Sequence, residues 1–417
     1  MQLKGLVSKT NKPVEKKKEV QEVALPFYTD TWLNAGLSFK RNEHGFYFQR
    51  EIFYELDHIH GKVDLSKLDD AIRYMQDAFP EHPLTMQIDQ PFRFYDTETT
   101  GLKGAGVLIF LNGILKRVED GFLLTQHILA DPSSEAAFLY ASDFWREEQS
   151  IITYNGKSFD FPQLVSRWTM NRSALPPLQT ISHIDLMHSS KRVWKDDLER
   201  FKLKQIEESK LDFQRVNDIP GHLAPIIYFD AIRSGDPTNL LKVLLHNEWD
   251  ILSLVALYIQ TVELIKEKEG IESAITYTNI GKWFRDLKVL EESQDWFQYV
   301  IDQYTEEEAG TAYYFVGLHL KKQKQYTESI QAFQTAVAQL TGKYKMDALV
   351  ELAKLYEHRI KDYELALEHT NSCISFLREI NADRESKLWQ DLHKRKIRII
   401  RKWNISRESA QPNKKRV

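Results

Sequence analysis

Three short segments of the chain place acidic residues where their side chains could act together. In the first, FRFYDTETTGL, an apolar strand ends in Asp96 and Glu98. Residues i and i+2 of a strand point to the same face, so both carboxylates leave the strand end together. Two like charges held this closely favour a bound divalent cation. Such pairs also arise by chance among 60 acidic residues, so the position at a strand end is what points to a metal site.

The other two segments follow later in the chain. SIITYNGKSFDFPQL reads as an apolar strand, a loop and then a helix that begins near Asp160. The Asp160 carboxylate could cap that helix or bind a metal. In LLKVLLHNEWDILSLVAL, His246 and Asp250 are i and i+4 on a helix and therefore share one face. On its own, this last pattern is more typical of a surface pair.

Taken together, the three segments resemble the DEDD exonuclease family of the ribonuclease H-like fold. That family has Asp-x-Glu on a strand, then an Asn followed by an aromatic-Asp pair, and a Tyr or His before a last Asp on a helix. DTETTGL, YNGKSFD and HNEWDILSL are most similar to the bacterial YprB-type branch, a ribonuclease H-like domain followed by helical repeats. The resemblance covers about residues 91 to 265.

The resemblance implies Asp96, Glu98, Asp160 and Asp250 as catalytic metal ligands and His246 as the general base. His246 departs from the family pattern, because it has the three-residue spacing usual for Tyr rather than the four-residue spacing usual for His. All-oxygen ligands select Mg²⁺ or Mn²⁺ over zinc. Two such ions can activate a water and stabilise the departing 3′ oxygen. The resemblance implies that the activity is that of a 3′-to-5′ exonuclease.

Four further residues are candidates for substrate binding. Thr99 and Leu102 follow the first motif, where relatives wedge against the terminal base, and Asn155 and Lys157 belong to the second motif. Lys157 could meet a phosphate oxygen, although an exposed loop lysine is ordinarily just solvated. Asp185, in HIDL, is a fifth acid at a strand end, and we expect it to hold loop amides.

The expected partner is the 3′ end of a single-stranded nucleic acid, and the sequence leaves the choice of DNA or RNA open. The alternative is a catalytically weak or inactive nucleic-acid-binding adaptor that recruits a protein partner through its repeats. The presence of all four acids argues for the enzyme, because a chain that had abandoned the chemistry would be free to replace them.

The elements that must position these residues form an α/β layout over residues 91–268. Its strands are FRFYD, VLIFLNG, FLLTQHIL, SIITYNG and HIDL, which predict a ribonuclease H-like domain with a mixed five-stranded sheet and a parallel edge. Residues 21–90 mix aromatic strands with one amphipathic helix and are expected to form an N-terminal α+β extension.

Beyond residue 240 the sequence reads as helix after helix and contains a repeat. Gly281, Gly317 and Ala353 lie 36 residues apart, and Phe297 and Phe333 stand 16 residues after the first two. This order of small and aromatic residues resembles the tetratricopeptide repeat, whose small residues let paired helices approach. We therefore expect an all-α repeat domain over residues 272–405, with a capping helix at 385–403, that binds an unidentified protein partner.

Composition excludes several classes of protein. The single cysteine, Cys373, excludes disulfide scaffolds and thiolate zinc sites and fits a cytoplasmic protein. No apolar run is long enough to span a membrane. The net charge of −4 divides into +4 over residues 1–20, +8 over residues 381–417 and −16 between them. Basic ends could hold a polyanion, and we expect residues 1–20 and 406–417 to be disordered basic segments.

Overall fold

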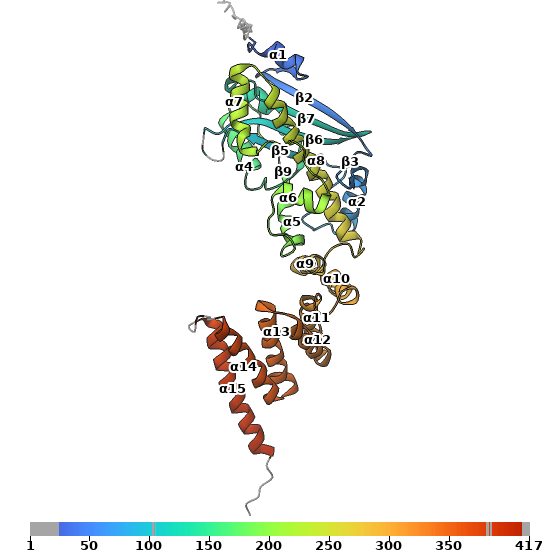
Figure 1. Cartoon of the computed structure of the whole chain (residues 1–417), viewed down its shortest axis with the longest axis vertical. Coiled ribbons are helices and arrows are strands. Elements are labelled where there is room, and N and C mark those ends of the chain that lie inside the picture. Colours follow the sequence, from blue (N-terminus) through green and yellow to red (C-terminus); the bar gives the residue numbers. More distant parts are fainter. Residues whose placement is uncertain (1–24, 102–103, 105, 381–382, 384–385, 411–417) are drawn as a thin grey trace, which may run out of the picture.

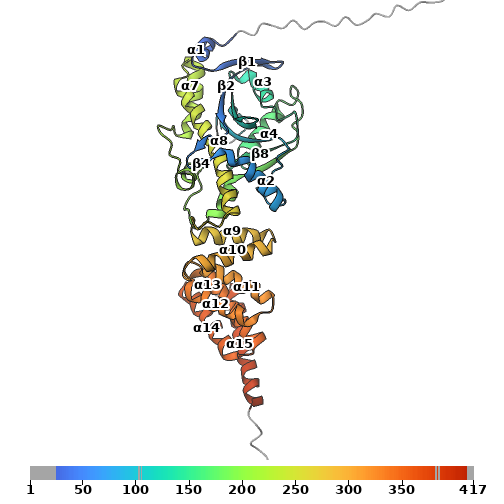
Figure 2. The ribbon, with the colours of Figure 1, turned by 90° about the vertical axis from the view of Figure 1, so that its right-hand side faces the viewer.

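The computed structural model describes residues 25–410 except 102–103, 105, 381–382 and 384–385 (Figure 1). The chain has an α/β half, residues 25–266, and a repeat half, residues 274–410, which lie end to end along the long axis (Figures 1 and 2). Residues 1–20, predicted to be disordered, and Leu102 lie outside the described residues. No helix in the described part of the chain combines the length and apolar character needed to cross a membrane.

A mixed sheet of seven strands forms the centre of the α/β half. Its order is β1-β2-β7-β6-β5-β8-β9, and the strands are β1 Ser38–Asn42, β2 Gly45–Glu55, β5 Phe92–Thr99, β6 Ile109–Val118, β7 Gly121–Ile128, β8 Gln149–Thr153 and β9 Ile181–Asp185. The pairs β5/β8 and β8/β9 are parallel, and the other pairs are antiparallel. The mixed sheet and its parallel edge are thus confirmed. The sheet is wider than the five strands predicted for residues 91–268, because β2 pairs with β7 and extends it.

Helices cover both faces of this sheet. Those that follow the strands are α2 Leu68–Ala78, α3 Glu135–Ala141, α4 Asp160–Met170, α5 Leu186–Trp194, α7 Ala224–Ser234 and α8 Thr238–Lys266. The longest, α8, contacts β5 and β6. From Ile251 to Val262 every residue of α8 is buried, which explains why most of this stretch is apolar.

One glycine allows α8 to approach the sheet closely. Gly113 of β6 lies opposite Asp96 of β5. A Cβ atom at Gly113 would lie 2.1 Å from Oδ1 of Asn247 and 2.4 Å from Cδ1 of Ile251, both on α8. Only a residue without a side chain leaves room for this contact. Gly113 therefore sets how near α8 comes to the strand that carries the first motif.

The repeat half consists of paired helices in the predicted order. They are α9 Ala274–Asp286, α10 Leu290–Gln303, α11 Gly310–Lys322, α12 Tyr326–Gln339, α13 Gly342–Leu355, α14 Tyr363–Glu379 and α15 Lys387–Ala410. A Cβ atom at Gly281 would lie 2.7 Å from the Phe297 ring, and one at Gly317 would lie 2.8 Å from the Phe333 ring. The small residues and aromatics of the repeat thus meet as the sequence predicts. Helix α15 continues to residue 410, past the predicted start of the tail at 406.

The two halves share one continuous apolar core. Phe79 and Phe284 meet across the junction with ring centroids 4.8 Å apart, and His82 and Trp283 meet at 4.4 Å. Helix α5 packs against α9, and Nδ2 of Asn279 donates hydrogen bonds to the carbonyl groups that end α5. The first repeat is therefore built onto the α/β half rather than joined to it by a linker.

Candidate active site

The four acids of the three motifs converge at one place on the sheet. Strand β5 presents Asp96 and Glu98 on one face, and α8 brings Asp250 to the same face. Asp160 is the first residue of α4, and its Oδ1 accepts hydrogen bonds from the backbone N–H of Thr97 at 3.2 Å and from its hydroxyl at 2.5 Å. Strand β5 thus touches the second motif directly. The structure places all four predicted ligands within electrostatic reach of one another.

The convergence brings the like charges of these carboxylates close together. Burial raises the pKa of Asp96 and of Glu98 well above the usual value, and the neighbouring charges of Asp250 and Asp160 raise both further. Burial also raises the pKa of Asp160 to about 6, although its hydrogen bonds from Thr97 oppose the change. A divalent cation would remove this repulsion, and a set of carboxylate oxygens is the donor chemistry that Mg²⁺ and Mn²⁺ prefer. The residues present therefore fit such an ion.

Asn247 also contributes to the site. The sequence analysis considered only the face shared by His246 and Asp250, yet the buried Asn247 amide donates a 2.8 Å hydrogen bond to Oδ2 of Asp96. The close approach permitted by Gly113 makes this contact possible. Asn247 therefore fixes the orientation of the Asp96 carboxylate, and this hydrogen bond partly offsets the rise in its pKa.

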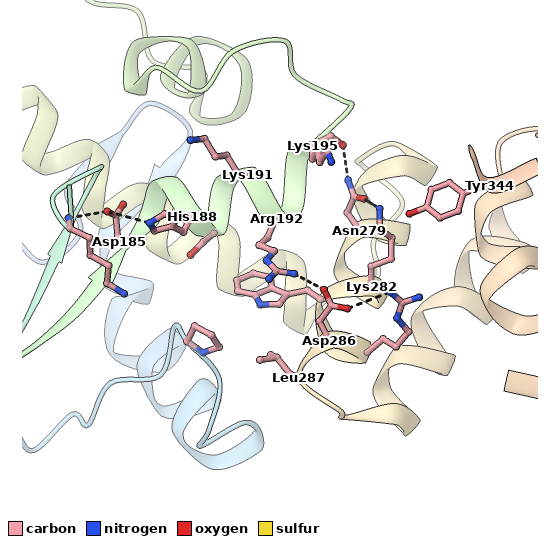
Figure 3. A pocket seen from close by; sticks show the side chains of 15 residues that line it. Asp185, His188, Lys191, Arg192, Lys195, Asn279, Lys282, Asp286, Leu287 and Tyr344 are labelled. Atoms are coloured by element: carbon pink, nitrogen blue, oxygen red, sulfur yellow. Dashed lines mark hydrogen bonds and ion pairs between the residues drawn. The ribbon is translucent and has the colours of Figure 1, made fainter. Parts of the chain in front are cut away.

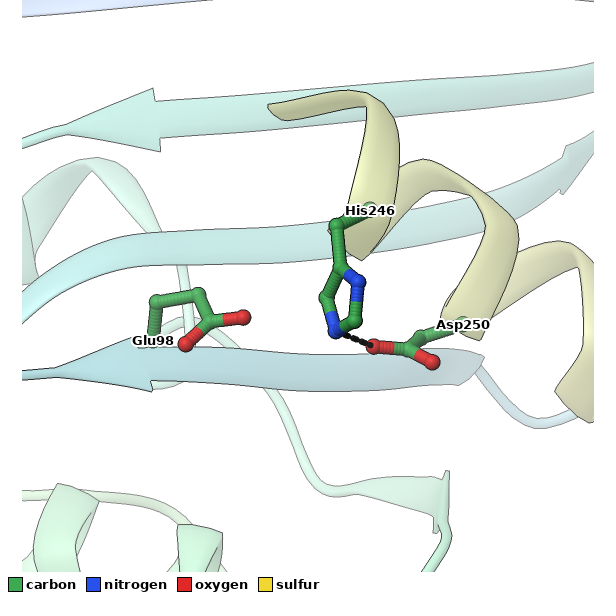
Figure 4. A group of neighbouring side chains, drawn as sticks. All are labelled: Glu98, His246 and Asp250. Carbon is green, nitrogen blue, oxygen red and sulfur yellow. Dashed lines mark ion pairs between the residues drawn. The ribbon is translucent and has the colours of Figure 1, made fainter. Parts of the chain in front are cut away.

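His246 lies with Glu98 and Asp250 in a group whose potential ligand atoms are all within 4.8 Å of one another (Figure 4). Its Nε2 is 3.4 Å from Oδ2 of Asp250, and its Nδ1 is 2.7 Å from Oδ1 of Asp218. The same Nδ1 lies 3.2 Å from Nη1 of Arg215. When Nδ1 carries the proton and donates it to Asp218, the Nε2 lone pair is directed toward the acids. In that state His246 can accept a proton, and it can equally bind a metal ion.

Arg215 is the functional residue that the sequence analysis missed. Its guanidinium is only 2% exposed and hydrogen-bonds to Oδ1 of Asp250, while Nε and Nη2 bind both oxygens of Glu207 at 2.7 and 2.6 Å. Although burial lowers the pKa of Arg215, the charges of Asp250 and Glu207 outweigh it and raise this pKa. Arg215 therefore neutralises part of the acidic cluster.

The network around Arg215 continues into the core. The Ser253 hydroxyl donates to Oε1 of Glu207 at 2.6 Å, and the same hydroxyl lies 2.8 Å from Nε2 of His60. Arg215 and Asp218 lie in an irregular segment between α5 and α7, where no periodic pattern marks them. Only their proximity to the acids in the folded chain identifies Arg215 and Asp218 as residues of the site.

Thr99, which follows the first motif, has no hydrogen bond to the acids within the described part of the chain. The buried Thr99 hydroxyl donates a 2.7 Å hydrogen bond to the carbonyl of Gly101, so the turn itself occupies this group. Leu102 lies outside the described residues. The structure leaves their predicted role in substrate binding open.

The second motif is held in place by Asp185. The Asp185 carboxylate accepts hydrogen bonds from the backbone N–H groups of Asn155, Lys157 and Met187 at 2.8, 3.0 and 3.1 Å. Asn155 has a left-handed conformation with φ of 65°, which turns the chain after β8. Asp185 thus has the structural role expected from the sequence, and the side chain of Lys157 is left exposed.

A cavity of about 430 Å³ gives access to the site. Arg215, Asp218, His246 and Asp250 line it together with the loop that contains Pro220 and Gly221. Its volume is within the range of sites that hold a small ligand. The predicted ligand Asp250 and the imidazole of His246 are therefore within reach of a substrate from solvent.

Comparison with known proteins agrees with this geometry. Residues 93–262 match the RNase_H superfamily, and this range contains all three acidic motifs and Arg215. The chain is also similar to an uncharacterized protein of Bacillus subtilis (strain 168), YprB. The two are 34% identical over 361 residues, which cover 85% of this chain and 86% of YprB. The similarity thus extends through both halves.

Proposed function

The chain belongs to the RNase_H superfamily and to one family with Bacillus subtilis YprB, and we propose on this basis that it is a 3′-to-5′ exonuclease of the DEDD type. The substrate is the end of a single-stranded DNA or RNA. The observation that carries the proposal is the convergence of Asp96, Glu98, Asp160 and Asp250, with His246 beside them. The superfamily fold supports the nuclease class, and the four carboxylates support the DEDD type.

Two divalent ions, Mg²⁺ or Mn²⁺, are the proposed cofactors. Asp96, Glu98, Asp160 and Asp250 would hold them. When bound, such ions polarise a phosphodiester, lower the pKa of water and stabilise the leaving oxygen. Because the pKa values of Asp96 and Glu98 are raised, protons compete with the ions for these ligands. Metal affinity should therefore rise with pH.

The other residues of the site position and transfer protons. His246 is the proposed general base, with Nε2 taking the proton of the attacking water. Asp218, 2.7 Å from Nδ1, orients the ring and stabilises its charged form. Arg215 holds Asp250 in place. Asn247 does the same for Asp96.

A second candidate is the nucleic-acid-binding adaptor with weak or absent catalysis. Arg215 favours it, because its charge already pairs with Asp250 and competes with a cation for that carboxylate. In this reading the repeat half recruits a protein partner. Both candidates bind nucleic acid, so hydrolysis is what separates them.

A pair of matched substitutions tests the proposal. Glu98→Gln removes one charge from the cluster, whereas Glu248→Gln removes one charge from α8 at a position that binds Arg50 and Tyr54 instead. Uniformly labelled single-stranded DNA and RNA are incubated with each protein and Mn²⁺. We expect mononucleotide release by the wild type and by Glu248→Gln, and none by Glu98→Gln. Equal release by all three proteins would exclude the cluster as the active site.

A further inference from the structure

A second cavity lies between the two halves and is strongly basic. This junction pocket has a volume of about 720 Å³ and is lined by α5, by α9 and by the loop that precedes α4 (Figure 3). Six cationic residues line it, namely Lys157, Lys191, Arg192, Lys195, Lys282 and Arg285. Only two acids, Asp185 and Asp286, face them.

The two acids do not neutralise the pocket. The Asp185 side chain has no exposed surface, and three backbone amides already bind its carboxylate. Asp286 pairs with Arg192 at 2.6 Å and with Arg285 at 3.3 Å. Lys191 and Lys195 are exposed and have no acidic partner within the described part of the chain. The pocket therefore carries an excess of positive charge available to a ligand.

The cations also crowd one another. Lys282 of α9 is partly buried, with Nζ 2.9 Å from Oδ1 of Asn279. Burial lowers the pKa of Lys282; the charge of Asp196 opposes this change, and the positive charges of Lys195 and Arg285 add to it. An anion in the pocket would relieve this repulsion. The aromatic ring of Tyr344, on α13, stands at the same cavity.

The junction pocket and the second acidic motif share one loop. The loop from Asn155 to Phe159 links β8 to α4, whose first residue is the predicted ligand Asp160. Lys157 of this loop lines the pocket, and its backbone is tied to Asp185 at the pocket wall. Lys157 thus lies in the pocket lining three residues before Asp160 in the chain, and it links the pocket to the second motif.

We propose that the junction pocket holds the sugar-phosphate backbone of the strand whose end is cleaved. The inference deepens the proposed function and rests on it. Lys191 of α5, Lys195 directly after α5 and Lys282 of α9 contact phosphates several nucleotides from the cleaved bond. The first repeat is therefore part of the substrate site, and its helices serve the nuclease in addition to any protein partner.

Binding measured without hydrolysis tests this inference. The full chain carrying Lys191→Gln, Lys195→Gln and Lys282→Gln is titrated in EDTA with a fluorescent 20-nucleotide single-stranded DNA, and with the RNA of the same sequence, at several salt concentrations. Each phosphate contact with a single strand contributes about 0.7 to the slope of log K against log salt. Losing three contacts should lower that slope by about 2 and weaken binding at low salt.

A control triple variant carries the same change in net charge elsewhere. Lys40→Gln, Lys62→Gln and Lys322→Gln replace exposed lysines that do not line the pocket, and this protein should bind with the wild-type slope. Equal slopes for all three proteins, or no binding by the wild type, would overturn the inference. Binding of an acidic peptide in place of the oligonucleotides would also overturn the inference. A pocket-dependent slope in a protein that never cleaves would support nucleic-acid binding by the pocket and refute the proposed function.

Discussion

Asp96→Asn isolates the electrostatics of the acidic cluster, because the amide keeps the shape of the carboxylate and can still accept the 2.8 Å hydrogen bond from Asn247. In the folded protein Asp96 must either take up a proton or face the charges of Asp250, Asp160 and Glu98. A pKa raised by one corresponds to about 1.4 kcal/mol. We therefore expect the substitution to raise the free energy of unfolding of the metal-free protein at pH 8 by about 1–3 kcal/mol, measured by urea denaturation in EDTA.

The pH and metal dependence provide the controls. An unfolded Asp ionises near pH 3.9, so the gain from Asp96→Asn should be absent below that pH and larger at pH 8 than at pH 5. Mn²⁺ at about 100 times its Kd should add about 2.7 kcal/mol to the wild type and much less to the variant. Glu248→Gln, with the same change in net charge, should show no such gain. A variant that is less stable than the wild type in EDTA, or equally stabilised by Mn²⁺, would refute the reasoning.

Three further predictions concern other parts of the chain. His246→Ala should slow hydrolysis by about 100-fold or more with Mn²⁺ affinity unchanged by calorimetry, and loss of metal binding would instead make His246 a ligand. Arg215→Met leaves the buried Glu207 without its cationic partner and should lower the free energy of unfolding, measured in urea, by about 3–5 kcal/mol. Adding Glu207→Gln should restore part of this loss, and an unchanged stability of Arg215→Met would contradict the prediction. Burial would raise the pKa of Glu357, but hydrogen bonds from Arg398 and Lys402 of α15 outweigh it and lower that pKa to about 2. The contribution of Glu357 to stability should therefore be complete above about pH 4.5 and be lost as the pH falls through 2. Glu357→Gln should accordingly speed proteolysis of α15 at pH 7, and equal rates would exclude this role.

The local patterns of the sequence were sufficient for the order of the elements but not for the extent of the sheet. Apolar runs and their separation by helices predicted the mixed sheet and its parallel edge. The strand character of GFYFQREIFYEL was also visible, yet a strand pattern does not identify the neighbouring strand. The pairing of β2 with β7 depends on contacts between residues far apart in the chain, such as Phe48 with Ile128.

The same limit applies to the boundary between the halves. The change from strands to helices near residue 240 is visible in the sequence, and it suggested that the halves fold separately. In the structure α8 is buried along its second part, and Phe79 packs against Phe284 of the first repeat. Apolar side chains such as these would be buried whether the halves had separate cores or one shared core. Composition therefore cannot distinguish separate cores from a shared one.

In the candidate site, the acids are predictable because each belongs to a local motif on a strand or helix. Arg215 and Asp218 belong to no such motif, since they lie in an irregular segment and reach the site only through the fold. Asn247 lies outside the helix face that His246 and Asp250 share, so helix geometry alone does not place it at the site. Gly113 supplies the reason for its contact, since α8 lies close enough to the sheet for a second face to reach Asp96.

The central claim is metal-dependent hydrolysis from the 3′ end, and one measurement tests it directly. Purified full-length protein is incubated with single-stranded DNA and RNA labelled at the 3′ or the 5′ end, in Mg²⁺, Mn²⁺ or EDTA. The account predicts immediate release of labelled mononucleotide from 3′-labelled substrate, a ladder of progressively shorter 5′-labelled products, and no products in EDTA. Release from the 5′ end, internal cuts, or intact substrate with both metals would contradict it.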